Sequence, residues 1–401
     1  MNIDIMPWID LAVRWLHVIA GIAWIGSSFY FVWLDDHLVK GKDMPDGVSG
    51  ELWAVHGGGF YHNQKYLVAP AKMPAELHWF KYEAYFTWIS GLLLLCIVYY
   101  YDASIFLIDS SKLTLTPLQA VGIGLTFIAG GWIVYDALCR SRIGDNAPLF
   151  GGLWFLVLLG SAYALTHIFS GRGAFIHVGA MIGTAMAANV FFVIIPNQKK
   201  VVATMLAGNT PDPRLGKKAK QRSLHNNYMT LPVLLIMVSN HYPMLFGSNA
   251  NWIVLAALSL AGVMVRHFFN LRHRGKFVWE LPAAAAAVFI GTMFFAADVE
   301  HRSEPAAVSH ARVPFAAVRA IVDRNCVSCH SAAPVHVGIL SPPAGLDFTK
   351  DEVLEKNASR IRVRTVTTQT MPLGNETHMT AAERATLGAW IDQGAHGEAG
   401  R

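Results

Sequence analysis

The chain has 401 residues, of which 53% are hydrophobic and 15% are charged. Soluble globular domains carry about 25% charged residues, so the composition excludes an ordinary soluble protein. It also excludes an intrinsically disordered chain, which needs low hydrophobicity and high net charge. Four cysteines are too few for a disulfide-stapled secreted fold. The formal net charge of +5 fits either nucleic-acid binding or basic loops beside a membrane, and the distribution of the charge decides between them.

The N-terminal segment does not read as a cleavable signal peptide. Residues 1–10 contain Asp4 and Asp10 and neither Lys nor Arg, whereas a signal peptide begins with a positively charged region. We therefore expect the first helix to insert with its N-terminus outside the cell membrane.

Apolar runs long enough to cross a bilayer, about 20 residues each, recur up to residue 300. Most of them lack the polar stripe that a surface helix of a soluble protein needs. The sequence predicts eight spans, at about 11–34, 79–101, 117–138, 151–170, 174–195, 229–246, 251–271 and 282–300. The sixth is the weakest, because Pro232, Asn240, His241 and Pro243 interrupt it.

The charges of the loops agree with this topology. The loops expected inside, 35–78, 139–150, 196–228 and 272–281, hold 16 Lys and Arg residues, whereas the loops expected outside hold only Lys112 and Arg172. Such asymmetry is the positive-inside signal of membrane proteins. It explains the basic balance without a nucleic-acid partner.

The composition changes near residue 301. A short, polar, proline-bearing stretch follows, and the residues after it have a mixed, soluble character. We predict a transmembrane helical domain over residues 1–300, a linker over 301–312 and a small domain over 313–398. Eight spans return the chain to the outside, so this last domain is expected to be extracytoplasmic.

The last domain contains Cys326-Val327-Ser328-Cys329-His330, the C-x-x-C-H motif of covalent haem c attachment. Two thiols bind the haem vinyl groups, and His330 then lies under the iron as an axial ligand. A thioredoxin-like motif would need a βαβ pattern, and a zinc site would need further ligands. The sequence shows neither.

Met371, followed by Pro372, is the best candidate for the second axial ligand, since Met/His ligation is usual in cytochromes c. Its rivals are Met379, His336 and His378. Helical spacing over 313–325, and a capping box of Thr380 and Glu383 that opens a helix over 380–394, predict a class I cytochrome c. The expected fold is thus all-α: a polytopic membrane bundle of about eight helices plus a cytochrome c domain.

Ionisable residues inside spans are costly and suggest function. Four histidines, His17, His167, His177 and His241, are expected toward the outside, together with Arg14. As a set they could hold a metal or a haem b, or bind an anionic substrate with Arg14. Singly, each could make a structural hydrogen bond between helices.

A second set is expected toward the cytoplasm, and it comprises His56, His62, His78, His225 and His267 with Asp35, Asp36 and Glu83. The three glycines at 57–59 stand between His56 and His62. They either allow a flat ligand to approach the backbone or form a turn beside interfacial aromatic residues. The polar segments 225–230 and 239–243 could hydrogen-bond the edges of a heterocycle.

The whole chain resembles the PuuD-type urate hydroxylases, bacterial membrane proteins with eight helices and a C-terminal cytochrome c domain. The resemblance rests on HVIAGIAWIGSSFYFVWLD at 17–35, WAVHGGGFYHNQKY at 53–66, LHWFKYEAYFTWISG at 77–91, NVFFVIIPNQK at 189–199, HNNYMTLPVLLIMVSNHYP at 225–243 and CVSCH at 326–330. It implies haem ligation by Cys326, Cys329, His330 and Met371. It carries over no catalytic residue of the membrane half.

The resemblance further implies oxidation of urate to 5-hydroxyisourate in purine breakdown. The electrons would pass to haem c, then to a soluble cytochrome and the respiratory chain, and a histidine would suit the role of general base at neutral pH. Two alternatives stay open: a quinol:cytochrome oxidoreductase with haem b in the membrane half, and a transporter with a tethered electron carrier. Only one interrupted span speaks for the transporter.

Overall fold

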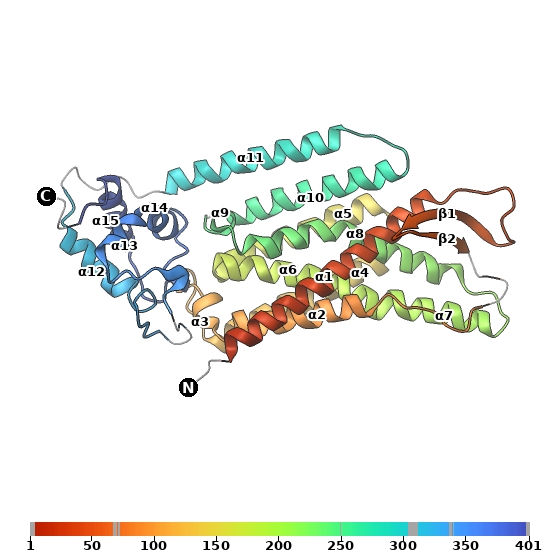
Figure 1. Cartoon of the computed structure of the whole chain (residues 1–401), viewed down its shortest axis with the longest axis horizontal. Helices are drawn as coiled ribbons and strands as arrows, with labels where there is room; N and C mark the ends of the chain where they lie inside the picture. Colours follow the sequence, from red (N-terminus) through yellow and green to blue (C-terminus); the bar gives the residue numbers. More distant parts are fainter. Residues whose placement is uncertain are drawn as a thin grey trace.

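The computed structural model describes residues 5–66, 70, 73–248, 250–303, 312–336, 339 and 341–397. Figure 1 shows a long bundle of helices that run roughly along one axis, with a smaller helical part at one end. A two-stranded hairpin lies at the opposite end. The smaller part, the described residues of 312–397, is named the tail domain, and the two ends of the bundle are the tail-domain end and the hairpin end.

The bundle is built from long apolar helices, the form in which a chain satisfies its backbone hydrogen bonds within lipid. Seven helices of the described chain are long and apolar enough to cross a membrane. They are α1 (Met6–His37), α2 with η1 (Tyr82–Leu94 and Leu95–Tyr100), α4 (Pro117–Arg140), α5 (Ala147–Ile168), the continuous α6, η3 and α7 (Gly171–Ala188, Asn189–Ile194 and Ile195–Leu206), α10 (Asn251–His273) and α11 (Glu280–Ser303). The predicted polytopic helical fold is confirmed.

The sixth predicted span differs from the structure in its extent. The helix there, α8 (Pro213–Ser239), begins well before residue 229, contains Pro232, and ends before the short α9 (Pro243–Phe246). It is not among the seven apolar helices, since its first half carries basic and amide side chains. It nevertheless packs against α6 and α10 inside the bundle (Figure 1). Among the described residues the bundle thus has eight long helices, of which seven, rather than the predicted eight, are apolar enough to cross a membrane.

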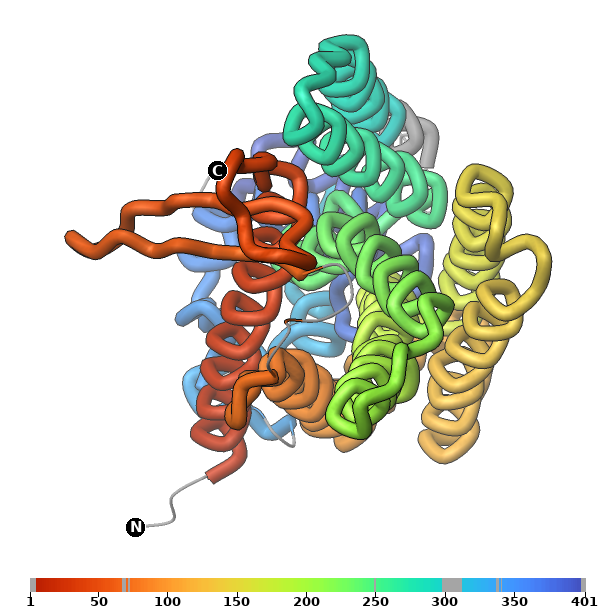
Figure 2. Tube along the Cα trace, turned by 90° about the vertical axis from the view of Figure 1, so that its right-hand side faces the viewer, coloured from red at the N-terminus to blue at the C-terminus, as the bar shows by residue number. Residues whose placement is uncertain are grey.

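The basic segments gather at the hairpin end. This end carries the hairpin itself, the turn η2 (Arg142–Asp145) between α4 and α5, the α7–α8 connection and the α10–α11 loop (Figures 1 and 2). Arg222, which the sequence reading counted within a basic loop, lies inside α8 and is 4% exposed. The remaining basic residues of these segments fit the predicted sorting of charge between the two membrane faces.

The hairpin was expected only as a loop. Strand β1 (Val48–His56) pairs antiparallel with β2 (Gly59–Tyr66). Gly57 and Gly58 both have positive φ, +56° and +79°, as the two central residues of a tight hairpin turn require. These two glycines therefore form a turn, which favours the turn interpretation. Trp53 stacks on His62 directly across the ladder, with ring centroids 4.2 Å apart.

The tail domain packs around one small core. Its elements are α12 (Phe315–Asn325), η4 (Pro343–Gly345), α13 (Asp351–Lys356), α14 (Ala358–Ile361), η5 (Arg362–Thr367), η6 (Leu373–Asn375) and α15 (Ala381–Asp392). The first and last helices, α12 and α15, pack on each other, as predicted, through a core that includes Val322, Leu387 and Trp390. Residues 304–311 of the predicted linker, and residue 398, lie outside the described residues.

The predicted capping box opens α15. The Thr380 N–H donates to Glu383 Oε2 at 2.8 Å, and the Glu383 N–H donates to Thr380 Oγ1 at 3.2 Å. The Thr380 N–H is also the main reason that the pKa of Glu383 is lowered. A helix of 12 residues that supplies Leu387 and Trp390 to the core is thereby fixed at its start.

Helices α4 and α6 approach each other closely where His177 is buried. His177 of α6 is fully buried, shares a hydrogen bond of 3.1 Å with the Tyr100 hydroxyl, and contacts the Gly173 carbonyl at 2.7 Å. The facing residue of α4 is Gly124, where an added Cβ would lie 2.4 Å from His177 Nε2. Only glycine leaves room for this imidazole.

We predict that Gly124→Ala lowers the thermal unfolding midpoint of the purified protein, because the methyl group would displace buried His177 and its bond to Tyr100. Gly122→Ala is the matched control, since it lies on the same helix and its Cβ would meet nothing within 4 Å. The control should leave the midpoint unchanged or raise it, by up to about 1 kcal/mol of helix propensity. Equal midpoints for the two variants would show that the close approach of Gly124 to His177 does not determine the stability.

Candidate functional site

Four consecutive polar residues, His225-Asn226-Asn227-Tyr228, lie near the middle of α8. Successive residues of an α-helix point about 100° apart, so the four side chains reach different neighbours. His225 and Asn226 contact α4 and η3, whereas Asn227 and Tyr228 contact α10. One polar segment therefore supplies two separate clusters.

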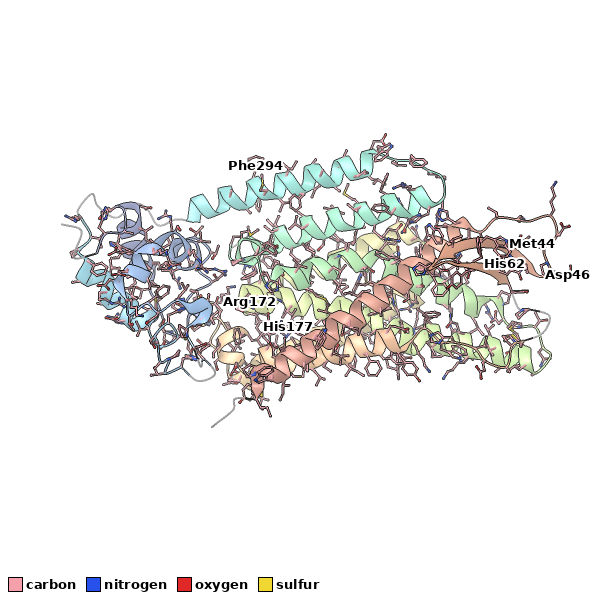
Figure 3. All side chains as sticks on the ribbon, in the orientation of Figure 1. Met44, Asp46, His62, Arg172, His177 and Phe294 are labelled. Carbon is pink, nitrogen blue, oxygen red and sulfur yellow. The ribbon has the colours of Figure 1, made fainter. Side chains whose placement is uncertain are left out.

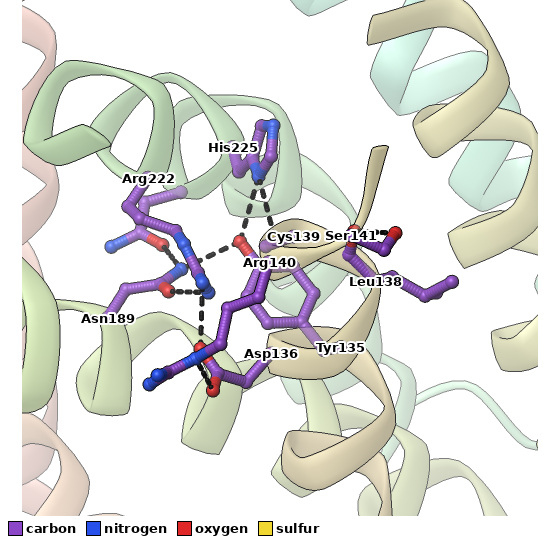
Figure 4. Close-up of polar contacts among 10 residues, drawn as sticks. Tyr135, Asp136, Leu138, Cys139, Arg140, Ser141, Asn189, Arg222 and His225 are labelled. Carbon is purple, nitrogen blue, oxygen red and sulfur yellow. Dashed lines mark hydrogen bonds and ion pairs between the residues drawn. The ribbon is translucent and has the colours of Figure 1, made fainter. Parts of the chain in front are cut away.

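The first, named the Arg222 cluster, joins α4, η3 and α8 (Figure 4). Arg222 Nη2 forms an ion pair with Asp136 Oδ1 at 2.7 Å, and Arg222 Nη1 donates to Asn189 Oδ1 at 3.0 Å. Asn189 Nδ2 lies 2.8 Å from both Asn226 Oδ1 and the Tyr135 hydroxyl. The charge of Arg222 is thus matched by a carboxylate.

The direction of these bonds fixes the state of His225. Because Asn189 donates to the Tyr135 oxygen, the Tyr135 O–H is free to donate to His225 Nδ1, which is 2.9 Å away. A neutral His225 then carries its proton on Nε2. Its ring stacks on Phe150, with centroids 4.3 Å apart. Asn189 is the first residue of the π-helical turn η3, a local widening of the helix that is frequent at functional sites.

A groove of about 1,670 Å³ lies between α5, α8 and α10, and His225, Tyr228 and His267 are among the residues that line it. The Tyr228 hydroxyl and His267 Nδ1 share a hydrogen bond of 2.7 Å. Apolar residues of α5 and α10 form much of its walls. Seven basic residues also line it, Arg140, Lys200, Arg214, Lys217, Lys218, Lys220 and Arg222. Such a groove suits a flat anion, and its two imidazoles are suitable proton acceptors.

The second cluster, named the Arg266 cluster, joins α1, α8 and α10 through Phe29, Asn227, Arg266 and Asn270. Asn227 Oδ1 accepts hydrogen bonds from Arg266 Nε and from Asn270 Nδ2, each at 2.9 Å. The Arg266 guanidinium lies over the Phe29 ring, 4.0 Å from its centroid. Three buried polar atoms of this cluster, Arg266 Nη2, Asn227 Nδ2 and Asn270 Oδ1, have no hydrogen-bond partner among the described residues.

The histidines expected toward the outside do not form one site. His17 Nδ1 lies 3.0 Å from the Thr87 carbonyl and from Ser90 Oγ, which ties α1 to α2. His177 is engaged with Tyr100. Each of the two therefore makes a structural contact between helices, the simpler of the two expectations.

The other members of that set are at the surface of the bundle. His167 is exposed and bonds the carbonyl of Tyr163 in its own helix, and His241 is exposed. Arg14 forms an exposed ion pair with Asp10 at 2.9 Å. The described residues contain no group of three or more His, Cys, Asp or Glu side chains placed to hold a metal ion. A haem b in the membrane half stays a prediction.

The histidines of the first basic segment lie far from these. His56 and His62 are in the hairpin, where His62 pairs with Glu51 at 2.8 Å. Figure 3 shows His62 at the hairpin end, whereas His177 and Arg172 lie toward the tail-domain end. His78 is exposed. Of the inner set, only His225 and His267 line the groove.

The C-x-x-C-H motif follows α12 directly, and its geometry fits a haem. The His330 N–H donates to the Cys326 carbonyl at 2.8 Å, so the motif forms a single turn. His330 Nδ1 lies 3.1 Å from the Leu346 carbonyl, which orients the ring and leaves Nε2 for an iron. Burial lowers the pKa of His330, which favours the neutral ring that a ligand needs. No disulfide joins Cys326 to Cys329, and burial raises the pKa of the Cys326 thiol to about 12.

Buried Arg384 holds the loop that carries Met371. Its guanidinium donates to the Thr365 carbonyl at 2.5 Å, to the Met371 carbonyl at 2.7 Å and to Asn375 Oδ1 at 3.0 Å. The three rival ligands are placed otherwise, since Met379 is buried in the core, His336 pairs with Glu376, and His378 is exposed. Met371 remains the predicted second ligand.

The same loop contacts the membrane bundle. Gly374 lies in η6, three residues after Met371, and has φ +59°. A Cβ added to Gly374 would lie 2.8 Å from the Ile108 carbonyl oxygen and 2.9 Å from the Ser104 carbonyl oxygen. These carbonyls belong to α3 (Ala103–Phe106) and to the residues after it. Ser110 Oγ donates to the Asn375 carbonyl at 3.2 Å. The Met371 loop is thus one of the parts of the tail domain that contact the bundle.

The fold and its buried polar clusters define a polytopic helical membrane protein with a small helical domain docked at one end. Residues 3–297 match the family model described as "Urate oxidase N-terminal", so the chain belongs to this family. The family assigns the chain in general terms as an oxidoreductase that acts on urate. No curated protein and no solved structure is similar enough to the chain to count as a match.

Several residues of the two clusters escaped the sequence reading. Arg222 was counted as a loop charge, and Asp136, Arg266 and Asn270 were not singled out. A signal existed for Arg266, because a basic residue within a span of apolar residues is costly. It was obscured because α10 ends in further basic residues, and the sequence does not show where the membrane interface falls.

We predict that Asp136→Asn destabilises the protein by about 3–5 kcal/mol, because it leaves the buried Arg222 charge without its carboxylate. Chemical denaturation of the purified protein in detergent measures this. Arg140→Gln is the control, since Arg140 pairs with the same carboxylate but its side chain is 70% exposed. Its effect should stay within about 0.5 kcal/mol. Similar losses in both variants would contradict a role for burial.

Proposed function

We propose that the protein is a membrane-bound urate hydroxylase that converts urate to 5-hydroxyisourate and delivers the electrons to a covalently bound haem c. The observation that carries the proposal is the combination in one chain of a urate oxidase family domain and a tail domain that carries a C-x-x-C-H motif and contacts the family domain through its Met371 loop. The family supports oxidation of urate in general, whereas the product and the electron acceptor are our proposal.

Cys326 and Cys329 would hold the haem through thioether bonds, and His330 and Met371 would ligate its iron. The hydrogen bond from His330 Nδ1 to Leu346 supports this, because it fixes the ring as a ligand. Bound there, the haem supplies an acceptor of single electrons. Arg384 keeps the Met371 backbone in place beside it.

The overall reaction balances as uric acid plus water giving 5-hydroxyisourate, two protons and two electrons. The chain must therefore accept protons as well as electrons. His225 and His267, which line the groove, are suited to take up the protons near neutral pH. The basic residues of the groove attract the urate anion. The haem would accept the two electrons one at a time. The substrate, oxidised by one electron, would therefore stay within the protein between the two transfers.

We infer that the protein lies in the bacterial inner membrane with the hairpin end in the cytoplasm. The support is the concentration of basic segments at that end. The N-terminus and the tail domain are then periplasmic, on the side where c-type haem is attached. From there a soluble cytochrome would carry electrons to the respiratory chain.

We predict that urate reduces the haem of the purified protein in the absence of oxygen. Two equivalents of haem should be reduced for each urate consumed, because the oxidation releases two electrons. The haem absorption spectrum in an anaerobic cuvette, together with urate consumption, measures both quantities. Addition of dithionite gives the full extent of reduction. Urate consumption that requires oxygen and leaves the haem oxidised would rule out the proposal.

We predict that Gly374→Ala slows reduction of the haem by urate, since the methyl group would force the Met371 loop away from the carbonyls of Ser104 and Ile108. The spectrum after dithionite should be unchanged. Gly345→Ala is the matched control, because Gly345 also has positive φ, +69°, but nothing lies within 4 Å of its Cβ. It should cost about 1 kcal/mol of stability and leave the reduction rate unchanged. Equal rates in both variants would argue against the docked route.

A further inference from the structure

Arg266 is a buried cation without a matching anion among the described residues. It is 5% exposed, and no described Asp or Glu lies within ion-pair distance of it. Arg222, on the neighbouring helix, is equally buried and does have a carboxylate, Asp136. This difference between the two arginines matters, because removing a charge from water is energetically costly unless a partner compensates it.

The hydrogen bonds that Arg266 does make determine what remains free around it. Asn227 Oδ1 must be the acceptor for Arg266 Nε, because a guanidinium only donates. The atom of Asn270 that approaches the same oxygen must then be its Nδ2. The unpartnered atoms are therefore two donors, Arg266 Nη2 and Asn227 Nδ2, and one acceptor, Asn270 Oδ1.

This pattern describes one kind of ligand. Two donors beside an uncompensated positive charge suit a deprotonated nitrogen or a carbonyl oxygen, and the acceptor suits an adjacent ring N–H. The edge of an anionic oxopurine carries these groups side by side. The side chains that offer them are almost fully buried, with Asn227 at 0% and Asn270 at 3% exposure. Chloride has no hydrogen atom to donate to Asn270 Oδ1.

The cluster lies next to the groove along α8 and α10, although Asn227, Arg266 and Asn270 do not line the groove themselves. Asn227 and Tyr228 are adjacent on α8, and Arg266 and His267 are adjacent on α10. Tyr228 and His267 bond to each other and line the groove. Asn226, the other neighbour of Asn227, is anchored in the Arg222 cluster through Asn189. The Arg222 cluster thus fixes the backbone of α8 from which Asn227 of the Arg266 cluster extends.

We propose that Arg266, Asn227 and Asn270 form the recognition site for the urate anion. The inference rests on the proposed function and adds to it the residues that bind the substrate. Arg266 supplies the counter-charge, Asn227 a second donor and Asn270 the acceptor that distinguishes a ring N–H from a bare anion. Phe29 supports the guanidinium from one face.

The test is urate binding to the full-length protein in detergent without oxygen, measured by equilibrium dialysis and by the shift of the thermal midpoint. Arg266→Gln should weaken binding by about 10- to 100-fold, the range for lost hydrogen bonds to a charged group. Arg274→Gln is the control: Arg274 follows the same helix, is exposed and pairs with Asp36 at 3.4 Å. Its affinity for urate should equal that of the wild type.

Asn270→Asp tests the same idea in a variant that should fold well. The new carboxylate would stand beside Arg266 and neutralise it, so the midpoint without urate should be equal to or above that of the wild type. Binding of urate should nevertheless fall at least 10-fold, because the substrate would meet a negative charge. A folded variant without affinity separates recognition from stability, and it carries the test if Arg266→Gln does not fold.

The outcomes distinguish this inference from the proposed function. Unchanged urate affinity in Asn270→Asp or in folded Arg266→Gln would overturn the inference and leave urate oxidation standing. Absence of urate binding to the wild type would overturn it too, as would an equal thermal shift with chloride or phosphate. Binding that depends on Arg266 in a wild type that fails to reduce its haem would support the inference and refute the proposed electron route.

Discussion

The structure depends on one constraint: polar groups buried in a helical bundle that spans lipid must find their partners inside the protein. Helix α8 shows how this works. It is the least apolar of the eight long helices, and its side chains between Arg222 and Tyr228 reach α4, η3 and α10. Hydrogen bonds between helices are directional, whereas lipid offers no hydrophobic force that would drive helices together. The polar helix therefore fixes how its apolar neighbours are arranged.

The two clusters on α8 apply this constraint in different ways. In the Arg222 cluster, charge and hydrogen bonds are balanced by Asp136 and Asn189, and such a network holds a unique arrangement of helices. In the Arg266 cluster the balance is incomplete. Since adjacent residues of α8 serve both, the first cluster gives the second a rigid base. A binding site needs such a base, because its polar groups must stay in place before the ligand arrives.

Much of this architecture could be predicted from the sequence. The lengths of the apolar runs predicted the long apolar helices, and the basic residues predicted which loops lie at the same end of the bundle. Thr380 and Glu383 predicted the start of α15. The predictions rest on local patterns of spacing and composition, which a single segment contains. The motif at Cys326–His330 belongs to the same kind, since its chemistry depends only on neighbours in the chain.

The clusters could not be predicted in this way. Which residues of four helices meet is decided by the rotation of each helix about its axis and by where it begins. The length criterion placed the sixth span at 229, so Arg222 fell in a loop, although α8 starts at Pro213. The four outer histidines were grouped by depth alone, yet His177 points at Gly124 and His17 at α2. The depth of a residue in the membrane can be estimated from its position in a span, whereas the direction in which its side chain points cannot.

The placement of the two proposed centres limits how they can work together. Helix α10 runs from Asn251 near the tail domain to His273 at the hairpin end. At 1.5 Å per residue, Arg266 lies about 22 Å along it from Asn251. Urate held by Arg266 would therefore not touch a haem held by His330. The electrons would have to cross the interior of the bundle, and the backbone contact at Gly374 would then matter because it keeps the end of that route at a constant distance. A domain that merely swung on its linker would vary this distance with every excursion, so the docked Met371 loop is the element that makes a fixed route physically reasonable.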